Sequence, residues 1–257
     1  MLRTLTAMMW FLALPSVAKQ VIMVGVDHAP PYSYIENEQV KSGLVLDILR
    51  AMPELADYQL APVACPIPRC LKMLAQGEID AMGGLVATPE RRQIMAFVEP
   101  PYMVLESSYV FYKRADNDLS VTRYEDLYNK RIAVIRGGAF FPRFDEDKKI
   151  NRVLINDEKT AIDLLLKERV DLVIAVEETA DHAMSILNQP SYQLAKVAFR
   201  HTQTIYGNLA LSRQFSSSHG GDLVRSGMAA LHHSNRLSLL VAPYQLPAIP
   251  KKLQSLP

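Results

Sequence analysis

Short apolar runs alternate with amphipathic segments along most of the chain. Residues 21–26 are apolar and rich in β-branched side chains, which predicts a buried strand. Residues 43–52 place apolar side chains at helical spacing and Pro53 follows, so we expect a helix that ends there. Residues 27–34 lie between them and contain two prolines, which force extended or turn conformations.

The alternation continues in two later sets, each read as strand, helix, strand. These elements are expected at residues 58–64, 70–76, 79–82, 132–135, 160–167 and 170–176. The order of strands and helices predicts an α/β fold in which mostly parallel sheets are flanked by helices.

The two sets share a sequence repeat. Five residues of the first set recur in kind 91 residues later; the pairs are Leu71 and Ile162, Met73 and Leu164, Leu74 and Leu165, Ile79 and Val170, and Asp80 and Asp171. Two lobes built alike explain this repeat, and the alternative is that any helix–strand unit has a similar pattern. Two lobes leave a cleft between them, and such clefts bind small ligands.

The N-terminus has the pattern of a secretory signal peptide. Arg3 precedes an apolar stretch at residues 5–14, and small residues stand at Ser16 and Ala18. About ten apolar residues are too few to cross a hydrocarbon layer of ~30 Å. We therefore expect residues 1–18 to be removed by cleavage after Ala18 and the mature protein to be periplasmic. The alternative is a buried N-terminal helix.

Composition narrows the class of protein further. The chain has 257 residues, of which 49% are hydrophobic and 21% charged, so it can bury a core and is not disordered. Its formal net charge is +1 and no Lys or Arg run stands out, which argues against nucleic-acid binding. A mean hydropathy of +0.02 excludes a polytopic membrane protein.

The sequence lacks the common motifs for metal, nucleotide and hydrolytic chemistry. None of the six histidines has HExxH spacing or a CxxC neighbour, and the adjacent His232 and His233 would splay apart on a helix. No GxSxG elbow, P-loop or GxGxxG is present. We therefore expect no metal, no cofactor and no enzymatic activity.

The two cysteines, Cys65 and Cys70, are separated by four residues. Two cysteines are too few for a disulfide scaffold or a zinc ribbon. An oxidising compartment permits a bridge between them, which would close a small loop and contribute about 2–3 kcal/mol at most. The alternative is that Cys70 is a reduced, buried helix residue.

Six segments, in order along the chain, resemble motifs of the family 3 extracellular solute-binding proteins, the periplasmic receptors of amino-acid ABC transporters. The segments are PPYSY with SGLVLDILRAM (30–34 and 42–52), CLKMLAQGEIDAM (70–82), ATPERRQIMAFVEPPYM (87–103), DLYNKRIAVIRGG (126–138), RVDLVIAVEETA (169–180) and YGNLALSR (206–213).

The resemblance implies a type II periplasmic-binding-protein fold, with two α/β lobes that close on a ligand by hinge motion. Each lobe would contain a mostly parallel sheet flanked by helices. Two crossing segments are expected near residues 104–109 and 205–214. Lobe one would then hold residues 19–105 and 212–257, and lobe two residues 106–211.

The resemblance also implies that Arg91 anchors the ligand. In the family, the arginine of the TPER motif grips the ligand's α-carboxylate with its planar fork, and the motif stands intact here at residues 88–91. The alternatives are a solvated arginine at a helix start or a partner of Glu90. Thr88 either contributes to the ligand site or caps the following helix.

Two departures from the family change the expected carboxylate site. Val86 stands where relatives have a hydroxyl donor, so backbone N–H groups of the 83–88 loop, including that of Gly84, would have to serve. The family's glycine–threonine anion site in lobe two corresponds to Gly138 and Ala139. The hydroxyl is lost there, but N–H groups can still face an anion.

The expected ammonium and aromatic positions differ as well. The family's aspartate corresponds to Val176, and Glu177 or Glu178 would replace it if the strand end shifts; otherwise both are surface carboxylates. Tyr32 and Tyr34 lie in the loop that covers the ligand in relatives, where their rings would contact the ligand unless they fill the core.

The loop after residue 64 completes the expected site. Relatives often place a stacking aromatic there, and this chain has Ile67 at that position. Arg69 would point into the cleft or into solvent.

Together these features predict a monomeric receptor that binds a small polar, amino-acid-like solute and delivers it to an ABC permease in the inner membrane. One alternative is a sensory or orphan member of the same fold. Another is a dehydratase-like enzyme, which would need a cleft carboxylate such as Glu177 or Glu178 as general acid.

Overall fold

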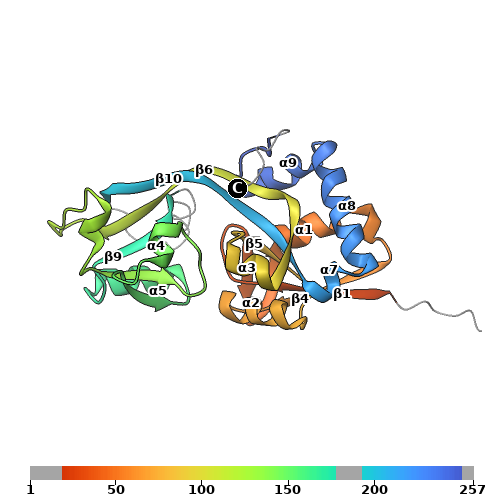
Figure 1. The fold of residues 1–257 in the computed structure, drawn as a ribbon, viewed down its shortest axis with the longest axis horizontal. Helices are drawn as coiled ribbons and strands as arrows, with labels where there is room; N and C mark the ends of the chain where they lie inside the picture. The colour runs from red at the N-terminus through yellow and green to blue at the C-terminus, as the bar shows by residue number, and fades with distance from the viewer. Residues whose placement is uncertain (1–18, 178–192, 251–257) are drawn as a thin grey trace, which may run out of the picture.

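The computed structural model describes residues 19–177 and 193–250 (Figure 1). The strands are β1 (Gln20–Val26), β2 (Ser33–Glu36), β3 (Gln39–Gly43), β4 (Tyr58–Ala64), β5 (Ala81–Leu85), β6 (Met95–Arg114), β7 (Arg131–Ile135), β8 (Asn151–Ile155), β9 (Leu172–Val176) and β10 (Leu194–Ser212). The α-helices are α1 (Leu44–Arg50), α2 (Ile67–Gln76), α3 (Pro89–Ile94), α4 (Pro142–Glu146), α5 (Glu158–Leu166), α7 (Arg213–Ser216), α8 (His219–His233) and α9 (Arg236–Val241). Short 3₁₀ helices occur at η1 (Pro53–Leu55), η2 (Tyr124–Leu127) and η4 (Ala242–Tyr244).

Within the described residues, the main sheet has eight strands in the order β4-β1-β5-β10-β6-β9-β7-β8, and β2 pairs with β3 in a separate hairpin. Figure 1 shows two groups of elements at the ends of this sheet. We call β1, β4 and β5 with α1–α3 and α7–α9 the first lobe, and β7, β8 and β9 with α4 and α5 the second lobe. The described helices do not include one long and apolar enough to span a membrane.

Parallel strands form the sheet of each lobe. In the first lobe β1 lies between β4 and β5, in a register that runs from Gln20 opposite Tyr58 to Val26 opposite Ala64. In the second lobe β7 lies between β8 and β9. The carboxyl half of β1 is buried, because residues 24–26 are covered by neighbouring elements of the lobe.

Two long strands, β6 and β10, carry the chain between the lobes. They pair antiparallel from Leu194 opposite Arg114 to Ser212 opposite Met95, with register shifts at two points. β10 pairs with β5 at one end and β6 pairs with β9 at the other. The two lobes therefore share one hydrogen-bonded strand order, and their sheets are joined rather than separate.

The turn that follows α2 recurs after α5. The Gly77 amide donates to the Leu74 carbonyl at 3.2 Å, and the Glu168 amide donates to the Leu165 carbonyl at 3.1 Å. Both turn residues have positive φ, at 74° for Gly77 and 56° for Glu168. Glycine adopts this conformation without steric cost, whereas glutamate does not.

The repeated aspartates make matching contacts. The Asp80 carboxylate accepts the Met23 amide at 2.8 Å, and the Asp171 carboxylate accepts the Arg131 amide at 2.7 Å. Each aspartate amide in turn donates to the carbonyl of the same partner at 2.8 Å. Asp80 and Asp171 thus set the start of β5 and β9 against the neighbouring parallel strand, and the 91-residue repeat corresponds to a repeat in structure.

The fold class expected from the sequence is confirmed: two sets of mostly parallel strands flanked by helices, linked by two crossing segments. The sequence analysis did not assign α8, which has 15 residues, and it missed the short elements α4, β8, β2 and β3. These four are only four or five residues long. Segments that short carry too few apolar positions for a period of 2.0 or 3.6 to emerge.

We predict that Gly207→Ala destabilises the protein by about 1–3 kcal/mol, the usual cost of overpacking. β6 and β10 approach so closely at this point that a Cβ on Gly207 would lie 2.9 Å from Met103 Cβ and 3.0 Å from its sulfur. Urea denaturation measures the free energy of unfolding. Gly43→Ala is the control, because its Cβ would meet atoms no nearer than 3.7 Å. Equal stability of the two variants would contradict the prediction.

Candidate functional site

A cavity of about 280 Å³ lies between the two lobes. The carboxyl ends of β1 and β5 reach it from the first lobe, and those of β7, β8 and β9 reach it from the second. Carboxyl ends of parallel strands are the usual ligand-binding edge of open α/β sheets. Among the described lining residues the charged side chains are Asp27, Arg91 and Glu158, and most of the remaining wall is apolar.

Arg91 links the two lobes through its guanidinium group. Its Nη1 donates to the Val86 carbonyl at 2.8 Å in the first lobe, and its Nη2 donates to the Gly137 carbonyl at 2.7 Å beside the second. Burial lowers the pKa of the guanidinium, and the carboxylates of Asp145 and Glu90 act in the opposite direction. Arginine nevertheless stays charged in proteins, so the cavity contains a fixed cation.

Thr88 is the N-cap of α3. Its hydroxyl accepts the Arg91 backbone amide at 3.3 Å, which is the capping role considered from the sequence. Thr88 lines a neighbouring cavity of about 480 Å³ and not the cavity that contains Arg91. Thr88 therefore affects the site only indirectly, by capping the N-terminus of α3, the helix that carries Arg91.

The predicted glycines lie at the cavity. Gly84 and Gly138 both line it, each from a different lobe. Gly84 has a φ of 74°, and a Cβ on the adjacent Gly83 would lie 2.4 Å from the Tyr102 hydroxyl. Gly83 therefore leaves space that a side chain would take from the Tyr102 hydroxyl, and Gly84 adopts a backbone conformation that favours glycine.

The other predicted residues divide between the cavity and its surroundings. Tyr32 lines the cavity, whereas the described lining residues do not include Tyr34, whose ring lies edge-on to His28 at 6.3 Å. Arg69 lines an adjoining cavity of about 670 Å³ that shares Asp27 and Glu158 with the first.

Glu177 lies outside the cavity lining. Its carboxylate pairs with Lys196 at 3.0 Å and with Arg200 at 3.1 Å on β10. Val176 lines the cavity at the end of β9, so the strand end has not shifted to bring Glu177 into the site. The alternative residue, Glu178, lies outside the described residues, as does the expected signal peptide.

Sequence analysis missed two carboxylates at the cavity, Asp27 and Glu158. The pKa of Asp27 is raised to about 6, mainly by burial and in part by the Glu158 carboxylate. Burial also raises the pKa of Glu158, although its side chain remains accessible from the cleft. Asp27 directly follows β1, so its position at a strand's carboxyl end was a usable signal. For Glu158, the sequence around the first residue of α5 carries no such signal.

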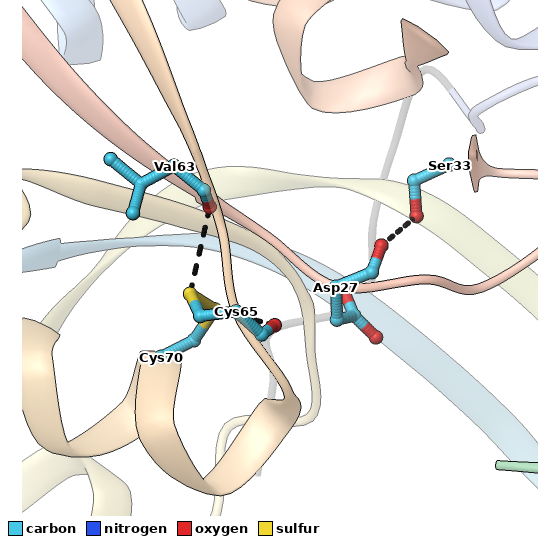
Figure 2. The surroundings of a disulfide bond; sticks show 5 residues. All are labelled: Asp27, Ser33, Val63, Cys65 and Cys70. Atoms are coloured by element: carbon cyan, nitrogen blue, oxygen red, sulfur yellow. Dashed lines mark hydrogen bonds between the residues drawn. A yellow bond between two sulfur atoms is a disulfide. The ribbon is translucent and has the colours of Figure 1, made fainter. Parts of the chain in front are cut away.

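Cys65 and Cys70 form a disulfide bond, with their Cα atoms 5.4 Å apart (Figure 2). Both residues are buried. The Cys65 amide donates to the Val26 carbonyl at 3.0 Å, which places the bridge beside the end of β1 and next to Asp27. The disulfide closes the turn that contains Ile67, and Ile67 lines the cavity. This is the loop in which the resemblance places a stacking aromatic, and here the disulfide holds it covalently.

The described residues contain no group of three or more His, Cys, Asp or Glu side chains that could hold a metal ion. The described lining residues of the cavity thus form a mostly apolar chamber with one cationic side chain, Arg91, and two acidic ones, Asp27 and Glu158.

Residues 22–237 match the model of the bacterial extracellular solute-binding proteins, family 3. The chain belongs to this family. Its fold is also that of solved amino-acid-binding proteins. The P235GK mutant of ArgBP from T. maritima is 21% identical, with a TM-score of 0.70 over 88% of this chain and 95% of that one. ArtJ from Geobacillus stearothermophilus, an arginine-, lysine- and histidine-binding protein, is 20% identical, with a TM-score of 0.70 over 88% and 95%.

Sensor proteins are also similar to this solute-binding protein. A histidine kinase sensor domain with similarity to periplasmic binding proteins is 19% identical, with a TM-score of 0.72 over 90% of this chain and 99% of that one. A putative sensor protein of Shewanella frigidimarina is 24% identical over 177 residues. The match includes 68% of this chain and 26% of the relative, so the chain spans about a quarter of the length of that relative.

We predict that replacing both cysteines with alanine lowers the free energy of unfolding by about 2 kcal/mol, the entropic value of so short a loop. Urea denaturation under oxidising conditions measures the change. Reductant should shift the wild-type midpoint in the same direction and leave that of the double variant unchanged. A wild-type midpoint that is insensitive to complete reduction would contradict the prediction.

Proposed function

We propose that this solute-binding protein holds one small, amino-acid-like solute in the cavity between its lobes and releases it unchanged. The observation that supports this proposal is the position of Arg91, a partly buried guanidinium in an otherwise mostly apolar chamber. A cation in such a place attracts an anionic ligand group strongly, because water screens the interaction poorly there.

Arg91 is the proposed anchor for the ligand's carboxylate. An arginine has five N–H donors in a planar fork, and two of them bind the carbonyls of Val86 and Gly137. The other three have no hydrogen bond among the described residues, so the fork can receive a carboxylate while it keeps both carbonyls. The alternative is that Arg91 only braces the loop and the lobe contact.

Hinge motion would give the solute access to the cavity. We propose that residues 19–105 and 212–257 move as one lobe and residues 106–211 as the other, with bending in β6 and β10. The Arg91–Gly137 hydrogen bond crosses this division and would form on closure. The protein would act as a monomer, since one chain supplies every wall of the cavity.

We further propose that the protein is exported and delivers its solute to an ABC permease. Membership of an extracellular solute-binding family supports export, and cleavage after Ala18 remains our expectation. Similarity to a histidine kinase sensor domain and to a putative sensor protein favours a second candidate, in which the bound state is reported to a receptor.

We predict that Arg91→Ala weakens binding by about 2–5 kcal/mol, the usual cost of removing one partner of a buried charge pair. Arg91→Lys should also bind poorly, because a point charge cannot replace the planar fork. Calorimetry measures both, with the amino acid that a thermal-shift screen identifies. Arg92→Ala is the matched control on α3, since Arg92 does not line the cavity. Unchanged affinity in Arg91→Ala together with a lower melting temperature would favour the brace.

We further predict that deleting the gene abolishes uptake of that radiolabelled amino acid by intact cells. Complementation with the wild type should restore uptake, and Arg91→Ala should not. If uptake persists while the cell's transcriptional response to the amino acid disappears, the sensory role is correct and delivery to a permease is not.

A further inference from the structure

We propose that closure of the cleft brings Asp27 and Glu158 together and requires one positive charge between them, supplied either by a proton or by a cationic side chain of the ligand. The ligand-supplied case rests on the proposed solute binding. The proton-supplied case rests only on the hinge motion and can be tested without a ligand.

The two carboxylates come from opposite lobes. Asp27 follows β1 in the first lobe, and Glu158 is the first residue of α5 in the second. Both line the cavity of about 280 Å³ and both line the adjoining one of about 670 Å³, so they face the same space. Since the lobes are proposed to move about β6 and β10, opening would separate the two groups and closing would bring them together.

Neither carboxylate has a basic partner that neutralises it. Among the residues that the structure describes, no Lys or Arg side chain forms an ion pair with Asp27 or Glu158. The Ser33 hydroxyl donates to the backbone carbonyl of Asp27 at 2.6 Å and not to its carboxylate (Figure 2). Like charges brought close together repel each other, which opposes closure unless one is neutralised.

The surrounding charges do not remove this repulsion. The other charged or titratable side chains among the described residues that line the two cavities are His28, Glu38, Arg69, Arg91, Asp157, Tyr32, Tyr102, Tyr109 and Tyr206. Asp157 raises the pKa of Glu158 and His28 lowers it, burial being the larger cause in the upward direction. Arg91 is held by the carbonyls of Val86 and Gly137.

His28 lines the adjoining cavity and must be distinguished from the pair. Its Nδ1 accepts the Ile35 amide at 3.0 Å, so its single proton in the neutral form lies on Nε2.

The sign of the proton effect follows from the direction of the shifts. The pKa of Asp27 is raised to about 6 with the lobes in this arrangement, mainly by burial, and that of Glu158 is also raised. A carboxyl with a higher pKa in the closed state than in the open state binds its proton more tightly when closed. Protons therefore favour closure below about pH 6, and this contribution is lost as the pH rises through that value.

Small-angle X-ray scattering of the ligand-free protein tests proton-driven closure. The wild type should have a smaller radius of gyration at about pH 5 than at about pH 8. Asp27→Asn should abolish the difference, and Glu158→Gln should reduce it, because burial is the larger cause of the raised pKa of Asp27. Asp163→Asn, a control on the same helix α5 outside the cavity lining, should keep it. His28→Gln should also keep it. A wild type that does not respond to pH, or loss of the response in His28→Gln, would overturn the proposal.

Calorimetry with L-glutamine and L-arginine as probes tests the exchange of a proton for a ligand charge. The neutral side chain of L-glutamine should bind roughly tenfold more tightly at about pH 5 than at about pH 7.5, given a closed-state pKa about two units above the open one. L-arginine should show little pH dependence, and Glu158→Gln should reduce that of L-glutamine. Equal pH dependence for both probes would overturn the inference. If neither probe binds, the scattering experiment decides the inference alone, and the proposed function is tested separately by the thermal-shift screen.

Discussion

The antiparallel pairing of β6 with β10 is the interaction on which the rest of the structure depends. These strands of 20 and 19 residues carry the chain out to the second lobe and back, and the parallel strands of each lobe pair onto opposite ends of them. The space between the lobes therefore exists only while this ladder is intact. Any change in its twist moves both cavity walls at once, which is why the close approach at Gly207 and Met103 matters.

The two cavity walls differ in chemistry. The first lobe contributes Asp27 and Arg91, whereas the described lining residues of the second lobe are apolar or glycine except for Glu158. A solute could therefore dock on the first lobe through its charges, while the second lobe removes water and strengthens those interactions. Arg91 already connects the walls through Val86 and Gly137, so the ligand would complete an existing contact between the lobes.

The sequence predicted the fold because periodic apolar positions and the recurring aspartates reflect local constraints. Asp80 and Asp171 recur at the same place, just before a strand, so their spacing marks them although their partners Met23 and Arg131 lie on a neighbouring strand. The site depends on contacts between distant segments, and local patterns do not encode these. Glu177 is one residue beyond the family's aspartate position, which is Val176 here, and its ion pairs with Lys196 and Arg200 are set by β10. Glu158 became a candidate only when the second lobe was seen to face Asp27.

Asp80 and Asp171 hold the strands at one edge of the sheets, whereas the cavity lies at the other. Each one ties the entrance of β5 or β9 to its neighbour by a side-chain and a backbone hydrogen bond, at the edge opposite the cavity. Strand register is thus secured where no ligand binds. Loops at the other edge can accept substitutions such as valine for a hydroxyl residue at position 86 without losing the fold. Mutations in these loops can therefore alter which solute binds while the fold is retained.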